Sequence, residues 1–495
     1  MISPNPYMRP FAYQRRKSQH AIRTSSYVVI GVGVVGMLVA FAVEGAILMS
    51  ASSGVVLCGC AMNSMGRQVI SVRPSTLVAM TCALQFAFSN ARAVASFDTP
   101  EQSSYLAYPV SKHFFTAAVI GALGGIAMWL GTRLAEGKGE GGSKSPKKNP
   151  FRITFVVPEQ RARKILLQLL AGSLVVILFV PIDWLGTIGS VIELLPLLVV
   201  FLWSRLLDLK QKRGWLILYL MVGGLALHAF FFAFLRVQIV VPVMLAGLGL
   251  FSTHGLKFLR SVRLVPMAVL LLVFAGLFSI LGEIRNTSTG VGRWNALTEK
   301  LGNEGDASGF TLLGRISTVS QLTQIVRLTE ENGFYGGSTM EYLAYVFIPR
   351  VVWPDKPLIA KGQWFAEEID QGRVLDSGQY SNSINMTVPG ELYLNFGFSG
   401  VIAGCMIAGS LMGLVYRGVS SGGPYDLLGG AMVGYVFFVA ATTGADVQVL
   451  VTFIAIYLVF VGAYYALEFL YTRRERKEAR TKGRVREQVR IVRRA

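Results

Sequence analysis

The chain has 495 residues, of which 53% are hydrophobic and only 15% are charged. Soluble domains carry about 25% charged residues, and the apolar residues here form runs of about 18 or more, so the composition excludes a set of soluble domains and predicts one all-α, polytopic membrane domain. The formal net charge of +19 lies mainly between the apolar runs, and we expect no nucleic-acid partner.

The first part of the chain predicts a basic N-terminus and four membrane helices. Residues 1–26 are polar and basic. The apolar run 27–65 is too long for one span, and Glu44-Gly45 near its middle predicts a tight hairpin of two short helices, with one long tilted helix as the alternative. Further spans are expected at about 75–91 and 113–132.

The middle of the chain alternates basic linkers with apolar segments. Residues 133–164 form a cytoplasmic linker rich in Gly and Lys. Two spans are expected to flank the turn 181–184, a hairpin of two more covers about 214–252, and another span ends near Leu281. We assign all of these helices to one membrane region, 27–282.

A long polar segment, 283–390, follows this region. We interpret it as a large extracytoplasmic loop that contains short helices. The second membrane region, 391–471, leads into a basic cytoplasmic tail, 472–495. Its spans are expected at about 391–416, 426–443 and 446–470, which brings the predicted total to about 12.

The distribution of charge predicts the orientation of these spans. Lys and Arg are enriched in cytoplasmic loops. With the N-terminus in the cytoplasm, every basic cluster falls on the inner side, and so do both termini. The segment 283–390 then lies outside, and it has nine Lys and Arg against twelve Asp and Glu. The inner clusters are 67–73, 133–164, 205–213, 257–263, Arg417 and the tail.

Several motifs of soluble catalysis are missing from the sequence. It has no DxD pair, no CxxC and no cluster among its four histidines, so we expect neither a metal site nor a cofactor. The four cysteines lie inside apolar segments, which favours small buried side chains over a disulfide. They are Cys58, Cys60, Cys82 and Cys405.

The polar segment and its borders are rich in arginine and aromatic residues. Guanidinium groups bind phosphates bidentately and keep their charge, and aromatic faces can carry sugar rings. This combination suits a lipid-diphosphate-linked saccharide, and the alternative is an interfacial aromatic belt with snorkelling arginines. The candidates for the diphosphate are Arg236, Arg285, Arg315 and Arg350, and those for the glycan are Trp353, Trp364 and Tyr393.

Three carboxylates in this region have different expected roles. Ser338 and Glu341 fit a capping box at the start of a short helix that Pro349 ends, which gives Glu341 a structural role. Asp355 lies in a stiff proline-bordered turn, and Glu391 lies at the mouth of the next span. Either could accept a proton, although the helix dipole alone would also explain a carboxylate at the position of Glu391.

Six short motifs follow one another across this region. They are Gly336-Gly337-Ser338, Ile348-Pro349-Arg350, Trp353-Pro354, Lys356-Pro357, Glu391-Leu392-Tyr393 and Asn395-Phe396-Gly397. In this order they resemble bacterial oligosaccharide repeat-unit polymerases, the Wzy-type O-antigen and exopolysaccharide polymerases, over about 230–400. The related O-antigen ligases share the architecture, but the histidine expected in the outer loop of a ligase is absent here, which favours a polymerase.

The resemblance implies an inverting, metal-independent glycosyltransferase of the bacterial cytoplasmic membrane. It would join saccharide units carried on undecaprenyl diphosphate at the outer face, with a flippase and a chain-length regulator of the same pathway as possible partners. The four arginines would hold the diphosphate, and Glu391 or Asp355 would accept the proton. A transporter or flippase of lipid-linked saccharides and a noncatalytic assembly subunit are the alternatives, although the sequence shows no internal repeat of the transporter kind.

Overall fold

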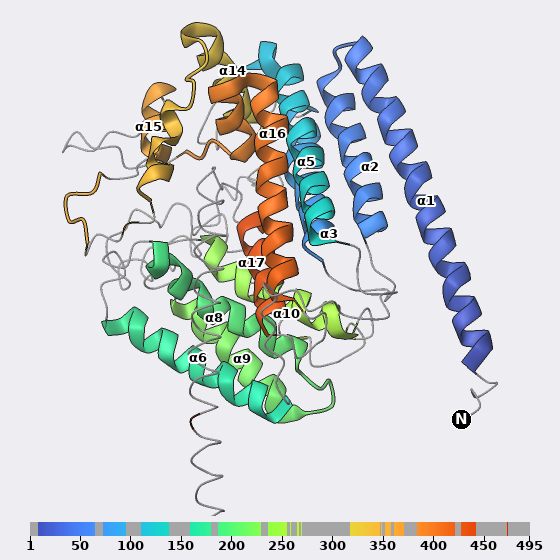
Figure 1. Ribbon diagram of the computed structural model, residues 1–495, viewed down its shortest axis with the longest axis vertical. Coiled ribbons are helices and arrows are strands. Elements are labelled where there is room, and N and C mark those ends of the chain that lie inside the picture. Colours follow the sequence, from blue (N-terminus) through green and yellow to red (C-terminus); the bar gives the residue numbers. More distant parts are fainter. Residues whose placement is uncertain are drawn as a thin grey trace, which may run out of the picture.

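The computed structural model describes most of the helical part of the chain, in some helices by the backbone alone. The described residues are 8–64, 73–95, 110–137, 159–179, 187–228, 236–254, 317–346, 352–357, 361–370, 384–420 and 427–441, with 258, 265, 266, 269, 348 and 473. Across these residues all regular structure is helical (Figure 1). The prediction of an all-α protein is therefore confirmed for this part of the chain.

Five of the described helices are long and apolar enough to cross a membrane. They are Thr24–Ala42, Ala46–Ser64, Pro74–Ala95, Ser111–Glu136 and Val388–Val419. Two shorter apolar helices cover Leu194–Arg205 and Val241–His254. The spans expected near Leu281 and at 446–470 lie outside the described residues, so the total of about 12 spans stays a prediction.

The N-terminal apolar run forms the predicted hairpin rather than one long helix. Helix α1 (Met8–Ala42) turns back at Glu44, which has a φ of 49°, into α2 (Ala46–Ser64). The two helices pack closely because small residues face each other. A Cβ atom on Gly33, for example, would lie only 2.7 Å from the Cγ2 atom of Val56.

The next two predicted spans are also present. The first is one helix in three consecutive parts, namely α3 (Pro74–Cys82), the π-helical turn η1 (Ala83–Phe88) and α4 (Ser89–Ala95). The second is α5 (Phe114–Glu136), which follows the 3-10 turn η3 (Ser111–His113). The four cysteines lie in helices, three of them buried and Cys58 half-buried, and none forms a disulfide.

Helix α16 (Val388–Val419) reverses direction near its beginning. Gly397 has φ 64° and ψ −155°, which no helix contains. In a straight helix Leu392 and Gly404 would lie about 18 Å apart. Instead, a Cβ atom on Gly404 would overlap the side chain of Leu392. The chain therefore folds back at Gly397 and packs on itself.

We call the two parts of α16 the re-entrant segment, 388–396, and the spanning segment, 398–419. The re-entrant segment returns into the bundle, and a Cβ atom on Gly124 of α5 would lie 2.6 Å from the Cγ atom of its Pro389. One candidate span is present where a span was predicted at 391–416, but the helix is interrupted at Gly397, so the predicted beginning of the span is corrected. A glycine within an apolar run gives no sign of whether the helix continues through it or reverses.

The spanning segment packs along α5 through glycine. Cβ atoms on Gly409 and Gly413 would overlap the carbonyl oxygens of Met128 and Thr132, respectively. The residue numbers at these contacts increase by four on both helices. The two helices therefore run parallel, and their backbones lie close together. This contact fixes the re-entrant segment relative to the rest of the bundle.

A second group of helices gathers at the far end of α16 from α14 and α15 (Figure 1). The group comprises α6 (Glu159–Phe179), α8 (Thr187–Arg205), α9 (Lys212–His228), α10 (Arg236–His254) and α17 (Leu427–Ala441). Large side chains such as Phe201, Trp215 and Tyr435 are fully buried between them. The hairpin predicted over 214–252 corresponds to α9 and α10.

Three short helices occupy the described part of the polar segment. They are α14 (Val319–Asn332), the 3-10 helix η7 (Ser338–Ala344) and α15 (Lys361–Glu368). Helix α14 is amphipathic and buries its apolar face, including Leu322 and Ile325. Short helices were expected in this segment, and the structure places them around the re-entrant segment.

Candidate functional site

The carboxylate of Glu391 is the centre of the candidate site. It belongs to the re-entrant segment and is completely buried, with 0% of its surface exposed. Lys361, at the start of α15, forms an ion pair with its Oε1 atom. The hydroxyl group of Thr339 in η7 lies 3.4 Å from the same oxygen. Three elements that are separate in sequence therefore converge on one buried charge.

Lys361 is itself enclosed, with 11% of its side chain exposed. Its Nζ atom lies 3.8 Å from the centre of the Tyr342 ring, a cation–π distance. The backbone N–H of Ile384 donates to the carbonyl oxygen of Gly362 at 2.9 Å, which attaches α15 to the chain leading into the re-entrant segment. A buried ion pair needs such additional partners because each charge has lost its water.

Asn395 connects the re-entrant segment to η7. It lies one turn after Glu391, so both side chains share a helix face. Its amide nitrogen donates to Thr339 Oγ1 at 2.7 Å and to the carbonyl oxygen of Glu391 at 2.8 Å. Its amide oxygen accepts from the N–H of Gly337 at 2.9 Å. Asn395 thus holds Thr339 beside the carboxylate.

The glycine pair 336–337 caps the end of the re-entrant segment. The carbonyl oxygen of Leu394 accepts from the N–H of Tyr335 at 3.0 Å, and that of Asn395 accepts from the next N–H at 3.1 Å. The glycines have φ values of 61° and 100°, which other residues rarely adopt. The first and last of the six short motifs therefore contact each other across the site.

Thr387 begins the re-entrant segment. Its Oγ1 atom accepts from the N–H of Gly390 at 3.1 Å, as an N-cap does. Its φ of 65° is unusual for a β-branched residue. Glu391 follows in the first turn, where the helix dipole favours a negative charge. The expected dipole interaction and a chemical role for Glu391 are compatible in this geometry.

Asn90 attaches α14 to the membrane bundle. It is fully buried in the first turn of α4, just after the π-helical turn. Its Oδ1 atom accepts from the N–H of Thr318 at 2.8 Å and from the hydroxyl group of Ser317 at 2.9 Å. These bonds fix the start of α14, whose buried Ile325 contacts the backbone at Gly390. One side of the site is therefore anchored to the bundle.

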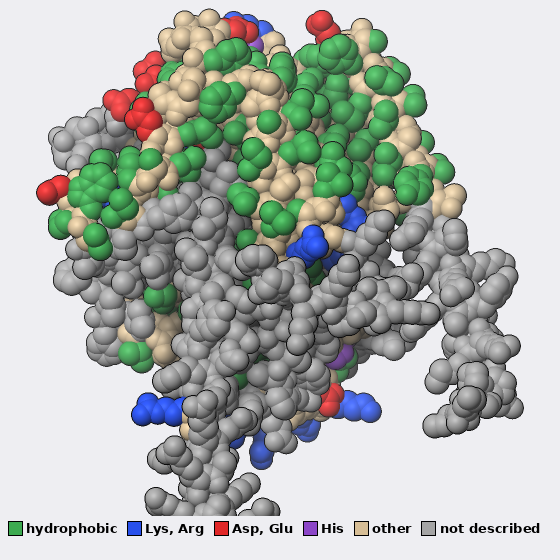
Figure 2. All heavy atoms as spheres, in the orientation of Figure 1, with side chains coloured by type: hydrophobic (Ala, Val, Ile, Leu, Met, Phe, Trp, Pro, Cys, Tyr) green, Lys and Arg blue, Asp and Glu red, His purple; other side chains and the backbone are tan. Residues whose placement is uncertain are grey.

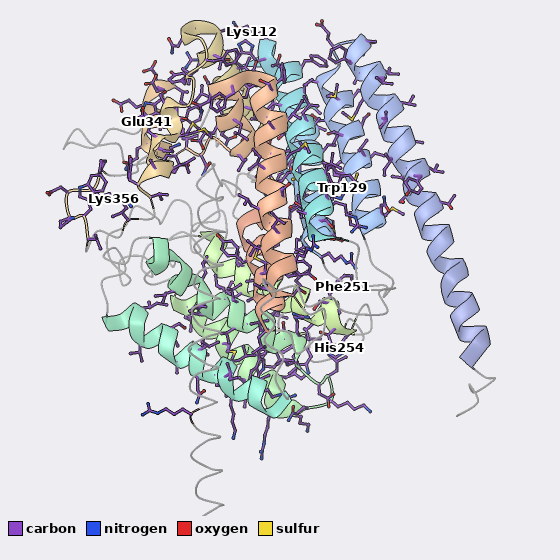
Figure 3. All side chains as sticks on the ribbon, in the orientation of Figure 1. Lys112, Trp129, Phe251, His254, Glu341 and Lys356 are labelled. Atoms are coloured by element: carbon purple, nitrogen blue, oxygen red, sulfur yellow. The ribbon has the colours of Figure 1, made fainter. Side chains whose placement is uncertain are left out.

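The turn 352–357 lies at the edge of the molecule, where Figure 3 labels Lys356. Asp355 is exposed there, and Trp353 is 38% exposed with an edge contact to Tyr345. Lys356 is buried and donates from Nζ to the carbonyl oxygens of Val346 and Ile348, both at 2.9 Å. Its ammonium group therefore attaches this turn to the chain that follows η7.

The rings of the other two aromatic candidates, Tyr393 and Trp364, pack against neighbouring aromatic rings. Tyr393 is 8% exposed and meets the rings of Phe334 and Phe398 edge-on, at centroid distances of 5.9 Å and 5.1 Å. Trp364 is half-buried and meets the ring of Tyr335 edge-on at 5.8 Å. Of the three aromatic candidates, Trp353 presents the most accessible face.

The side chains of the four arginine candidates lie outside what the structure describes. Arg236 is the first residue of α10, and its side chain lies outside the described atoms. The other three, Arg285, Arg315 and Arg350, lie outside the described residues altogether. Within the part of the chain that is described, no three His, Cys, Asp or Glu side chains gather as metal ligands.

The predicted capping box does not form. Gly337, not Ser338, occupies the N-cap position of η7, and no side chain caps the helix. Glu341 is exposed (Figure 3) and the helix is a 3-10 helix that ends at Ala344. The left-handed conformation of Gly337 directs its N–H toward Asn395. The chain therefore does not adopt the geometry that a capping box requires.

The comparisons with known proteins place this site within a family. A sequence model of a domain of unknown function, DUF8712, matches residues 144–466. The chain belongs to the DUF8712 family. Neither a curated protein nor a solved structure gives a significant match. The DUF8712 region contains Lys361, Glu391 and Asn395, whereas helices α1 to α5 precede it.

Lys361 is the site residue of this DUF8712 protein that sequence reasoning missed. It lies 30 residues before Glu391, and no local spacing relates the two. Asn395 was noted only as part of a motif. Its spacing of four residues from Glu391 was a usable signal, because residues four apart on a helix are neighbours.

Charge is unevenly distributed between the two ends of the DUF8712 protein (Figure 2). Acidic side chains lie over α14 and α15 at the end near Glu391. They are Glu330, Glu331, Glu367, Glu368 and Asp370. Exposed basic side chains cluster at the opposite end, in the turn after α8 and at the start of α9. They are Lys210, Lys212 and Arg213.

Proposed function

We propose that this DUF8712 protein is a membrane glycosyltransferase that polymerises undecaprenyl-diphosphate-linked oligosaccharide units at the outer face of the bacterial cytoplasmic membrane, for O-antigen or exopolysaccharide synthesis. The observation that supports this function best is the completely buried Glu391 on a re-entrant helix, paired with Lys361. A carboxylate held out of water is costly to maintain, and a chemical role gives a reason for its position.

In the proposed reaction, Glu391 is the general base. It accepts the proton of the acceptor hydroxyl group while that oxygen forms a bond to the anomeric carbon of the donor. The bond from this carbon to undecaprenyl diphosphate breaks, and the electron pair leaves with the diphosphate. The single displacement inverts the anomeric configuration. Before the reaction, Lys361 forms an ion pair with the Glu391 carboxylate.

The structure represents a closed state in this proposal, because a base with no exposed surface cannot reach a sugar. Lys361 comes from α15, so a movement of α15 would separate the ion pair and uncover Glu391. The ammonium group would then be available for the negative charge that develops on the leaving diphosphate. The arginine candidates are proposed to complete the diphosphate site, and Trp353 is proposed to contact the glycan.

The distribution of charge supports an outer location for this site. Lys and Arg mark the cytoplasmic side of membrane proteins. The exposed basic residues Lys210, Lys212 and Arg213 lie where α8 leads into α9, at the far end of α16 from α14 and α15 (Figure 1). With that end in the cytoplasm, the re-entrant segment lies toward the outer side, where lipid-linked units are polymerised. We propose that both chain termini are cytoplasmic.

A transporter of lipid-linked saccharides is the second candidate, and the broken helix α16 favours it. Discontinuous helices form the substrate sites of many transporters, with helix N-termini directed at anionic groups. Here the first turn at the N-terminus carries Glu391, and its negative charge would repel a diphosphate. We therefore rank the transferase first.

Reconstitution of the purified protein distinguishes these functions. In liposomes that contain an undecaprenyl-diphosphate oligosaccharide as the only substrate, we expect dimers and longer saccharides on the lipid, measured by mass spectrometry. Movement of the lipid between leaflets without new glycosidic bonds would identify a transporter. Transfer only to an added lipid A core acceptor would identify a ligase. If neither a product nor movement of the lipid were observed, the protein would be a noncatalytic assembly subunit.

A further inference from the structure

A second charged cluster lies at the other end of the membrane helices. Its centre is Glu136, the last residue of α5, whose side chain is 1% exposed. Its Oε1 and Oε2 atoms accept from the hydroxyl group and the N–H of Ser75, at 2.9 Å and 3.2 Å. Glu136 thereby caps α3, where Arg73 occupies the N-cap position and provides no side-chain cap.

Two arginines share one oxygen of this carboxylate. Arg73 and Arg133 each place a terminal nitrogen near Glu136 Oε1, at 3.5 Å and 3.1 Å. Their side chains are 17% and 27% exposed. A guanidinium group has five N–H donors, and Glu136 receives only a terminal nitrogen from each. The carboxylate therefore positions both arginines while leaving donor capacity for another anion.

A third arginine comes from α16. Met128 and Thr132 of α5 face Gly409 and Gly413 of α16, so one further turn brings Arg417 level with Glu136. The Cδ and Nε atoms of Arg417 lie 3.8 Å from where a Cβ atom of Gly137 would be, and Arg417 is exposed. Two arginines therefore contact Glu136, and Arg417 lies beside the neighbouring Gly137. Among these four charged side chains, positive charge is in excess.

This cluster lies at the ends of three candidate spans. Pro74 begins one, Glu136 ends another, and α16 ends at Val419. The ends of membrane helices lie at the level of the lipid headgroups. Basic pockets between transmembrane helices at the cytoplasmic side bind anionic headgroups, and guanidinium groups bind phosphate oxygens bidentately.

We propose that Arg73, Arg133 and Arg417 form a binding site for the phosphate of an anionic phospholipid. Glu136 is the residue that positions Arg73 and Arg133 in this site. The occupant is a bilayer lipid and not a soluble phosphate, because the three helices that supply the arginines end at the headgroup level. The site is independent of the proposed transferase reaction, since it lies at the opposite end of α16 from Glu391.

Native mass spectrometry of the purified protein in detergent tests this site, with phosphatidylglycerol or phosphatidylcholine added. We expect phosphatidylglycerol to remain bound preferentially. Arg417→Gln should weaken its binding about fivefold, and the triple Arg73→Gln/Arg133→Gln/Arg417→Gln variant about 100-fold. The matched control removes three exposed positive charges elsewhere, in Lys210→Gln/Lys212→Gln/Arg213→Gln, and should bind as the wild type does.

Arg417→Gln keeps the proposal testable if the triple variant does not fold, because Arg417 is exposed and its loss leaves both arginine contacts of Glu136 intact. Equal binding of phosphatidylglycerol by the wild type and by folded Arg417→Gln would overturn the proposal. So would an equal loss in the control variant, which would indicate a general charge effect. Displacement of the lipid by millimolar inorganic phosphate would show that the site takes free phosphate instead.

Discussion

The Lys361→Met variant is expected to be less stable than the wild type by about 3–5 kcal/mol, because it leaves the buried Glu391 carboxylate without its cationic partner. Methionine is similar to lysine in length, so the change removes charge more than volume. The free energy of unfolding of the purified variants in mixed micelles, measured by denaturant titration, gives the difference directly.

The double variant Lys361→Met/Glu391→Gln is the matched control for this effect. It removes both charges, so no buried charge lacks a partner, and we expect most of the lost stability to return. It should still be inactive, because the proposed base is missing. A Lys361→Met variant as stable as the wild type would show that the ion pair does not hold α15 against the re-entrant segment.

Replacing Gly397 by alanine should also have a large effect. At φ 64° and ψ −155° a residue with a side chain is strained, at a cost of about 1–3 kcal/mol. The added Cβ atom would also lie 3.1 Å from the ring of Phe334. We expect lower thermal stability and loss of activity, because straightening α16 would withdraw Glu391 from Lys361.

Gly224→Ala provides the comparison for Gly397→Ala. Gly224 lies within α9, and no atom lies within 4 Å of where its Cβ would be. Alanine is favoured over glycine in a helix by about 1 kcal/mol, so this variant should be as stable as the wild type or slightly more so. If both variants melted at the same temperature, the reversal at Gly397 would not be required for the fold.

The sequence predicted those elements that depend on length and composition. The run 27–65 exceeds one bilayer thickness, so a hairpin near Glu44 followed from its length. Glu391 was a candidate because it lies at the mouth of a predicted span, where a carboxylate could accept a proton. The first four predicted spans match candidate membrane helices within a few residues, since long apolar segments have few structural alternatives in a membrane.

The elements that sequence reasoning missed depend on tertiary contacts. Glycine is common within membrane helices, so Gly397 carried no sign that the chain reverses there. Lys361 follows a proline-bordered turn, and its pairing with Glu391 results from how α15 packs. Ser338 and Glu341 have the spacing of a capping box. Instead, the turn at 335–337 donates backbone hydrogen bonds to the carbonyl oxygens at the end of the re-entrant segment.

The most direct test of the account is the rate of glycosidic bond formation by Glu391→Gln in liposomes with an undecaprenyl-diphosphate oligosaccharide. Glutamine keeps the shape of the side chain but cannot accept the proton. Loss of a general base should slow linkage formation by about 10²–10⁴-fold, with the folded fraction matched by size-exclusion chromatography. The account predicts that only traces of polymer form. Polymerisation by Glu391→Gln at the rate of the wild type would contradict it.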